Sequence, residues 1–142
     1  MNVTVTGPES SGQTWLKSCL SQHPDLLVDG DSVPCEWGIN RHYPDLSYKE
    51  NLIIICRDRT ISQTSVRQRG YNHGYEGEAF NEDSVLLALE LAASTAKNVL
   101  FVSYEGLLFY KQIYFNTIFD WLKVARIKVE TTYKDGNLKY LL

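Results

Sequence analysis

At 142 residues with 44% hydrophobic side chains, the chain can bury the core of one domain, and we expect a single domain over residues 1–142. Its formal net charge of −3 at pH 7 disfavours a general binder of nucleic acid or of anionic membranes, because both partners attract a basic surface. The three cysteines show no C-x-x-C spacing, which favours small buried thiols in a reducing compartment over a disulfide or a zinc site.

The first expected element is a short strand at residues 3–6, and it leads into a small-residue loop over 7–14. The loop has the Gly-x4-Gly spacing of a phosphate-binding Walker loop, with Thr14 where that motif carries Ser or Thr. Small residues let backbone N–H groups converge on an anion, and the following helix adds the positive end of its dipole. Gln13 occupies the lysine position, which disfavours ATP hydrolysis. The alternative is a Gly/Ser-rich turn that only connects a strand to a helix.

Strands and helices alternate along the rest of the chain. We expect a helix from residue 15 that ends at His23-Pro24, then a short strand over 26–28 and an irregular connection over 29–45. A buried strand over 51–56, a helix over 60–69 and a glycine-tyrosine loop over 70–77 follow. The next expected elements are a helix capped by Asn81, a buried strand over 99–102 and one long helix through Leu122. Residues 126–142 alternate as two strands about Asp135-Gly136, a hairpin signal. These elements predict a three-layer α/β/α P-loop-like domain with a mainly parallel sheet and a C-terminal β-hairpin.

Ligands of parallel sheets bind at the carboxyl ends of the strands. Gly7, Arg57 and Glu105 are all expected at such ends. Arg57 is suited to a planar contact with a phosphate. The alternative is a surface arginine in a solvated ion pair with Asp58 or Glu105.

Three segments together resemble the sulfotransferases. Residues 11–16, Ser-Gly-Gln-Thr-Trp-Leu, followed by His23-Pro24, resemble the family's 5′-phosphosulfate loop. Arg57 ends a strand and Ser65 comes eight residues later, as do the family's arginine and serine that bind a 3′-phosphate. Residues 103–108 resemble the family's Tyr-Glu-Asp-Leu strand end. The resemblance implies a transferase that uses 3′-phosphoadenosine 5′-phosphosulfate (PAPS) without a metal.

The resemblance also implies a set of site residues. Ser10, Ser11, Gly12, Gln13, Thr14 and Trp15 would bind the 5′-phosphosulfate, and Arg57 and Ser65 the 3′-phosphate. His42, in a segment similar to the family's His-Leu-Pro, would be the general base for a hydroxyl or amine acceptor. The alternative for His42 is an exposed loop histidine, His73 is the next candidate, and His23 is expected only to mark the end of a helix.

Two departures from the family pattern matter. Ser10 replaces the lysine or arginine that precedes the loop's Ser-Gly, and Lys17, Lys134 or Lys139 are candidates to supply the missing cation. The family's glycine-rich C-terminal nucleotide segment is not recognisable, so the acceptor pocket is either reduced or completed by a neighbouring subunit of a homo-oligomer.

The alternatives to a sulfotransferase are a non-catalytic anion- or nucleotide-binding module and a small P-loop kinase or NTPase. No apolar run approaches the ~18 residues of a membrane span and no leader pattern is seen, so we expect a cytoplasmic protein.

Overall fold

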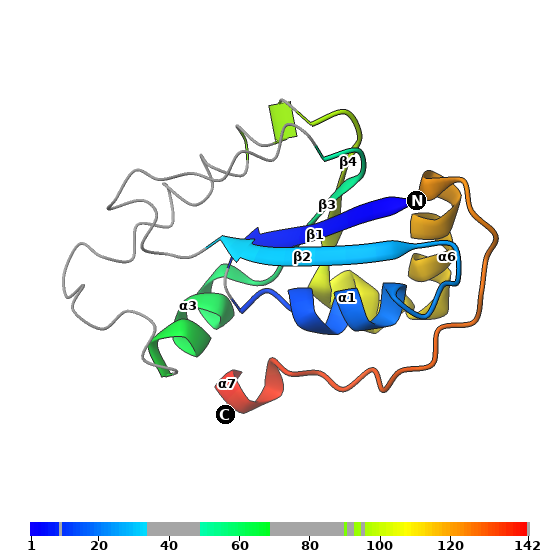
Figure 1. Ribbon diagram of the computed structural model, residues 1–142. Helices are drawn as coiled ribbons and strands as arrows, with labels where there is room; N and C mark the ends of the chain where they lie inside the picture. Colours follow the sequence, from blue (N-terminus) through cyan, green and yellow to red (C-terminus); the bar gives the residue numbers. More distant parts are fainter. Residues whose placement is uncertain (9, 34–48, 69–89, 91–92, 95, 142) are drawn as a thin grey trace.

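Four parallel strands form the centre of the structure, which is a computed structural model that describes residues 1–8, 10–33, 49–68, 90, 93–94 and 96–141 (Figure 1). The strands are β1 (Asn2–Pro8), β2 (Leu27–Val33), β3 (Leu52–Cys56) and β4 (Val99–Ser103). Their order in the sheet is β2-β1-β3-β4, and each neighbouring pair is parallel. The predicted α/β class and parallel sheet are therefore confirmed.

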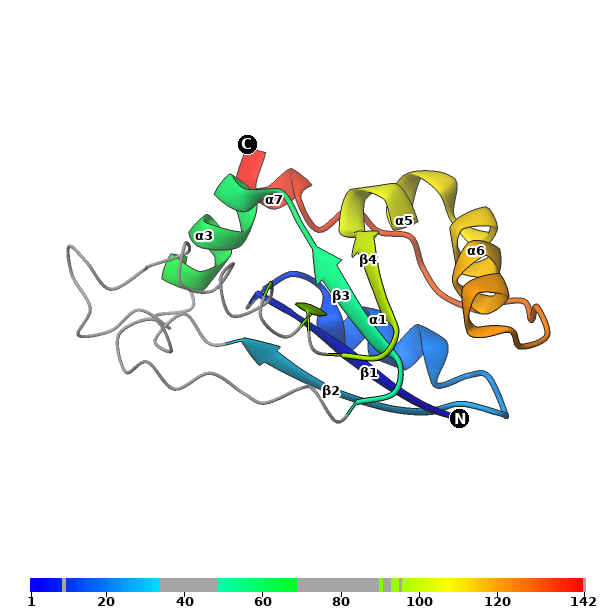
Figure 2. The same ribbon diagram turned by 90° about the horizontal axis from the view of Figure 1, so that it is seen from above.

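Helices flank this sheet, an arrangement consistent with a three-layer α/β/α fold. They are α1 (Gln13–Leu20), α3 (Arg59–Gln68), α5 (Tyr104–Tyr110), α6 (Gln112–Leu122) and α7 (Leu138–Leu141). Figure 2 shows α3 and the short α7 side by side beyond the carboxyl end of β3. The predicted elements at residues 3–6, 51–56, 60–69 and 99–102 correspond to β1, β3, α3 and β4.

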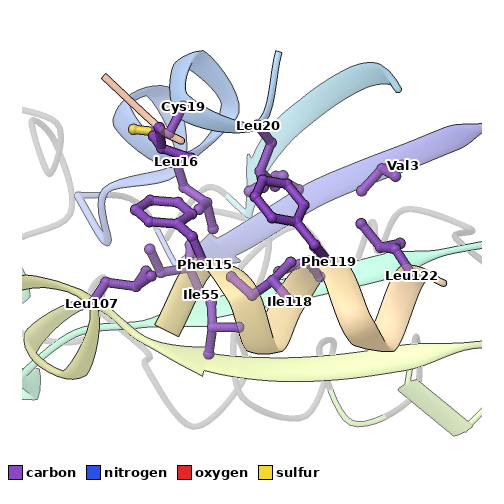
Figure 3. Packing of buried hydrophobic residues seen from close by; sticks show 14 of the residues in the cluster. Val3, Leu16, Cys19, Leu20, Ile55, Leu107, Phe115, Ile118, Phe119 and Leu122 are labelled. Atoms are coloured by element: carbon purple, nitrogen blue, oxygen red, sulfur yellow. The ribbon is translucent and has the colours of Figure 1, made fainter. Parts of the chain in front are cut away.

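The main core lies between the sheet and the helices α1, α5 and α6 (Figure 3). Strand residues of one face meet apolar helix residues there: Val3, Val5, Ile53, Ile55 and Val102 from the sheet, and Leu16, Leu20, Leu107, Phe115, Ile118, Phe119 and Leu122 from the helices. The helix residues recur at the three- and four-residue spacing of one helical face. The sheet and these helices therefore share one core.

The strand order creates a switch point between β1 and β3. From β1 the chain crosses to β2 on one side, and it then returns to place β3 and β4 on the other side. The two segments that leave the carboxyl ends of β1 and β3 thus diverge, and ligands of open parallel sheets bind in the crevice at this point. The loop after β1 and Arg57 after β3 both lie there.

The predicted C-terminal hairpin is not found. Residues 124–135 contain no strand, and a turn at residues 136–137 leads into α7. The backbone of this extended segment pairs with two glutamine side chains instead of a second strand. Gln22 Oε1 accepts from the Glu130 N–H at 2.8 Å and its amide donates to the Glu130 carbonyl at 2.8 Å. Gln112 Oε1 accepts from the Val129 N–H at 2.9 Å.

Three smaller expectations also need correction. The long helix is divided by Lys111, whose backbone has φ 55° and ψ −129°, into α5 and α6. Strand β4 is only partly buried, with Phe101 56% exposed, and Cys56 at the end of β3 is exposed. Strand β2 is longer than predicted and takes in the start of the connection expected from Asp29.

Three predicted segments lie wholly or mostly outside the described residues: the connection over 29–45, the loop over 70–77 and the helix from Asn81. None of the helices that the structure describes is both long and apolar enough to cross a membrane.

Candidate functional site

The loop after β1 is held by its own side chains. The Gln13 amide donates to the carbonyl oxygens of Gly7 at 2.9 Å and Pro8 at 2.6 Å. The Ser11 hydroxyl, which is fully buried, also donates to the Pro8 carbonyl at 2.6 Å. Gln13 and Ser11 thus fix the loop's shape, and their side-chain donors are used within the loop.

The loop reaches α1 through left-handed backbone at two residues. Ser10 has φ 62° and Gly12 has φ 93°. A Cβ on Gly12 would also lie 2.8 Å from the Tyr104 ring, so the close approach of Tyr104 requires glycine there. The tight turn brings the carboxyl end of β1 directly to the first turn of α1.

The first turn of α1 keeps its backbone donors available. The residue before the helix is Gly12, which has no side chain to cap them, and the first intrahelical bond runs from the Leu16 N–H to the Gly12 carbonyl at 3.0 Å. The N–H groups of Gln13, Thr14 and Trp15 are therefore not used by intrahelical bonds, and they lie at the positive end of the helix dipole, where an anion is favoured. Ser10 precedes this helix in the sequence. Its hydroxyl oxygen is buried and has no hydrogen-bond partner among the residues that the structure describes.

Arg57 connects the ends of β1 and β3. Its Nη1 donates to the Ser10 carbonyl oxygen at 3.0 Å, and its Nε donates to Asn137 Oδ1 at 2.6 Å. The guanidinium carbon lies 4.7 Å from the Tyr104 ring centre and 5.6 Å from that of Tyr140. Arg57 is half-buried and lies near two aromatic rings and the loop that precedes α1.

Arg57 has no carboxylate partner in the part of the chain that the structure describes. The ion pairs found there join Lys49 to Asp29, Arg126 to Asp120 and Lys128 to Glu130. Glu105 Oε1 instead accepts from the Asp58 backbone N–H at 2.8 Å and from the Asn137 amide at 2.9 Å. The solvated ion pair with Asp58 or Glu105, which the sequence left open, is not formed.

Ser65 lies in the same neighbourhood as Arg57. Its side chain is fully buried, and its hydroxyl oxygen accepts a hydrogen bond from the Tyr140 hydroxyl at 2.8 Å. Tyr140, whose ring also lies near the Arg57 guanidinium, therefore occupies a hydrogen-bonding position of the buried Ser65 hydroxyl. A phosphate would contact Ser65 directly only after Tyr140 had moved.

Three site residues were missed from the sequence, namely Tyr104, Asn137 and Tyr140. The Tyr104 hydroxyl accepts a hydrogen bond from the Gly136 N–H at 3.2 Å. Tyr104, whose ring packs against Gly12, therefore also holds the C-terminal segment. Asn137 and Tyr140 fall in the segment predicted as a hairpin strand. The Asp-Gly-Asn run is also the signal of an isolated turn before a helix, and the short Asx turn at Asp135, which accepts from the Asn137 N–H at 2.9 Å, is of that kind.

The predicted base His42 and its runner-up His73 lie outside the described residues. His23 is 2% exposed, accepts from the Asp25 N–H at 3.1 Å and contacts the Ala125 carbonyl at 2.8 Å, which agrees with a structural role at the end of α1. Of the lysine candidates for the missing cation, Lys139 lies 4.9 Å from the Tyr140 ring, and Lys17 lies against Gly30 of β2.

An open pocket of about 450 Å³ lies at the carboxyl ends of β3 and β4. Arg57, Glu105, Phe101 and Tyr114 are among its lining residues. Cys56 also lines it, and partial burial together with the Glu105 carboxylate raises the pKa of that thiol, so Cys56 is protonated at neutral pH. No cluster of three or more metal-binding side chains occurs within the described ranges.

No protein-family model matches the chain, and a search of curated proteins finds no match either. The case for a function therefore depends on the site itself.

Proposed function

We propose that the chain is a sulfotransferase-like protein that binds PAPS at the switch point and transfers its sulfuryl group to a hydroxyl or amine acceptor. The observation that carries this proposal is Arg57, a half-buried guanidinium at the end of β3 that contacts the loop before α1 and has no carboxylate partner among the described residues. A cation beside a helix N-terminus, with no carboxylate partner in the described ranges, favours a ligand with more than one anionic group.

The proposed roles follow from these positions. The backbone N–H groups of Gln13, Thr14 and Trp15 would bind the 5′-phosphosulfate, with the loop fixed by the Gln13 amide and the Ser11 hydroxyl. Arg57 would bind the 3′-phosphate through a charge-assisted contact. Ser65 would support this end of the site through Tyr140, or would contact the phosphate after Tyr140 moves.

The transfer step needs no metal in this proposal. The acceptor oxygen or nitrogen attacks sulfur, the bond from sulfur to the 5′-phosphate oxygen breaks, and the leaving phosphate keeps the electron pair. Donors aimed at the leaving oxygen stabilise its growing charge. His42 is the proposed base that takes the acceptor's proton. The open pocket at the ends of β3 and β4 is the candidate acceptor site.

A non-catalytic nucleotide-binding module is the second candidate. It is favoured by Ser10, which leaves the usual cation of the loop missing, and by the use of the Gln13 amide to hold the loop rather than to contact a ligand. The same two hydrogen bonds disfavour the kinase or NTPase alternative. The Gln13 side chain, which stands at the motif's lysine position, is bonded within the loop and is not extended toward a β- or γ-phosphate.

Ligand-dependent stability tests the proposal. We expect 3′,5′-adenosine bisphosphate to stabilise the protein by about 2.7 kcal/mol at a hundredfold excess over its dissociation constant. AMP, which lacks the 3′-phosphate, and ATP with magnesium serve as controls and should stabilise less. A larger effect of ATP with magnesium would instead favour the kinase alternative.

Transfer of labelled sulfate to phenols, sugars and amines separates the enzyme from the binding module. We expect transfer that falls by about 10²–10⁴ in the variant His42→Ala while binding of the bisphosphate is retained. Binding without transfer to any acceptor would support the module, and unchanged transfer in the variant would remove His42 from the mechanism.

A further inference from the structure

Asn137 makes hydrogen bonds to both a cation and a carboxylate of the site. Its Oδ1 accepts from Arg57 Nε at 2.6 Å, and its Nδ2 donates to Glu105 Oε1 at 2.9 Å. The residue is only 7% exposed, and its backbone N–H is held by Asp135 Oδ1 at 2.9 Å. Asn137 is thus a buried neutral side chain with a cation on one side and a carboxylate on the other.

The chemistry of the neighbours fixes the amide in this orientation. A guanidinium only donates hydrogen bonds and an ionised carboxylate only accepts them, so a flipped amide would face donor with donor and acceptor with acceptor. Glu105 is itself held by the Asp58 backbone N–H at 2.8 Å. The oxygen and the nitrogen of the Asn137 amide therefore each have a complementary partner. The neutral side chain acts as a rigid spacer between Arg57 and Glu105.

The spacer has an electrostatic consequence. Arg57 and Glu105 follow the ends of the paired strands β3 and β4, where Cys56 is opposite Ser103. A direct pair between guanidinium and carboxylate would neutralise Arg57, and an anionic ligand would then have to break that pair in order to bind.

We propose that Asn137 is a positioning residue that keeps Arg57 and Glu105 apart and so leaves the charge of Arg57 available to an anionic ligand. For the 3′-phosphate of PAPS this inference rests on the proposed function. The competing explanation is that Asn137 only attaches the C-terminal segment to the domain. The two differ in the role of the Glu105 charge, which matters only in the first.

Rescue by a second substitution tests the inference. The variant Asn137→Ala frees Glu105 to pair with Arg57, and we expect it to weaken binding of 3′,5′-adenosine bisphosphate and of inorganic pyrophosphate by tenfold or more, measured by calorimetry. In the double variant Asn137→Ala/Glu105→Gln the contact of Asn137 is still absent but the competing charge is gone. Affinity should then return to within about threefold of wild type. Glu105→Gln alone is the matched control and should bind at least as well as wild type.

Two results would overturn the inference: unchanged affinity in Asn137→Ala, or a loss that Glu105→Gln does not reverse. The second result would show that Asn137 serves only to attach the C-terminal segment. If Asn137→Ala does not fold, Asn137→Ser takes its place, because a serine is too short to contact Arg57 and Glu105 together.

A ligand-free measurement separates this inference from the proposed function. The coupling between the effects of Arg57→Gln and Glu105→Gln on the free energy of unfolding should be larger in the Asn137→Ala background, where the two charges can meet directly, than in the wild-type background, where hydrogen bonds through Asn137 join them. If wild type bound neither probe, the proposed function would fail while this cycle still decided the role of Asn137. Coupling that is no larger in the Asn137→Ala background than in wild type would refute the spacer.

Discussion

Arg57 joins two parts of the chain that are far apart in the sequence. Ser10 lies 47 positions before it and Asn137 lies 80 positions after it, and both accept hydrogen bonds from its guanidinium. From the sequence alone, replacing Arg57 would be expected to change stability by no more than about 0.5 kcal/mol, as for a surface site. The contacts change that expectation, because a half-buried arginine with two acceptors also supports the fold.

We therefore predict two separate effects of Arg57→Ala. The free energy of unfolding, measured in urea, should fall by about 1–3 kcal/mol because two hydrogen bonds and two ring contacts are lost. The dissociation constant for 3′,5′-adenosine bisphosphate should rise by at least tenfold, the loss of about 1.4 kcal/mol or more that a charge-assisted bond represents.

Adenosine 5′-phosphosulfate is the control for this variant, because it has no 3′-phosphate. It should bind wild type and Arg57→Ala with similar affinity. If its affinity falls as much as that of the bisphosphate, Arg57 acts through the loop or contacts the 5′ end of the ligand.

Gln13 provides a test of how the loop is held. In the variant Gln13→Glu a carboxylate oxygen would replace the amide nitrogen that donates to the Gly7 and Pro8 carbonyls, so that two acceptors would face each other. We expect this nearly isosteric change to lower the free energy of unfolding by more than Gln13→Ala does, and by roughly 1–3 kcal/mol relative to wild type. Equal unfolding midpoints for wild type and Gln13→Glu would contradict the two hydrogen bonds.

At the scale of elements, β1 and β3 approach each other closely at Gly7. A Cβ added to Gly7 would lie 2.3 Å from the Ile55 carbonyl oxygen, which belongs to the backbone of β3 and cannot turn aside as a side chain can. Gly7→Ala should therefore push the two strands apart at the site and cost at least about 2 kcal/mol of unfolding free energy. Gly136→Ala is the comparison, because its Cβ would meet the tip of a side chain, the Tyr104 hydroxyl, rather than backbone. An equal cost in both variants would argue against this packing.

The C-terminal segment supports α3 from outside the sheet. Its hydrogen bonds at the site include the one that Asn137 accepts from Arg57, the one that Asn137 donates to Glu105 and the one that Tyr140 donates to Ser65. A chain ended after Lys134 loses them all, so we predict faster amide hydrogen exchange in α3 and unchanged exchange in β1 and β3. Equal protection of α3 in the full and shortened chains would show that α7 contributes nothing to it.

This segment is also where the sequence misleads. Alternating residues about Asp135-Gly136 predict a hairpin from local pattern alone, whereas the segment's real partners are Gln22, 108 positions away, and Gln112, 17 positions away. Side-chain amides that pair with backbone leave no periodic signal in a sequence. The break at Lys111 was likewise hidden, because the apolar spacing continues on both sides of it.

For the whole molecule, the sequence predicts the architecture better than the site. Buried parallel strands produce continuous apolar runs, so β3 was recognisable without any long-range information. The glycine spacing and the strand ends also bring the loop and Arg57 to one edge of the sheet. What could not be predicted is which groups Arg57 contacts, since Asn137 reaches the site only through a segment without regular structure.

Acid sensitivity should depend in part on Asp29. Its burial acts to raise the pKa of the carboxyl, but hydrogen bonds from Thr4 at 2.6 Å and Lys49 at 2.9 Å outweigh that effect and hold the pKa below its usual value. A carboxyl with a lowered pKa in the folded state stabilises the fold above about pH 4, and this contribution is lost as the pH falls through the folded-state pKa. Asp29→Asn should therefore show a smaller fall in unfolding free energy between pH 6 and pH 3 than wild type.

Thr4→Val, which removes only the hydroxyl donor, should reproduce part of that difference. An identical pH dependence in wild type and Asp29→Asn, measured by urea unfolding at both pH values, would contradict the role of this carboxyl.

Trp15 occupies an unusual place for an optical probe. Its indole N–H donates to the Thr131 hydroxyl at 2.9 Å, and its ring lies 5.9 Å from that of Tyr104, edge to face. Tyr104 in turn contacts the Arg57 guanidinium. One aromatic ring thus separates the indole from the cation of the site, and the other side of the indole is attached to the extended segment before α7.

The chain has three tryptophans, and the two besides Trp15 are Trp37 and Trp121. Replacing those two with phenylalanine would leave Trp15 as the sole indole emitter. Its emission would respond to an anion that binds at Arg57, because Tyr104 contacts both groups. It would also respond to release of the extended segment, because that would break the hydrogen bond to Thr131. The protein would then report occupancy of its own site by intrinsic fluorescence, without an attached dye.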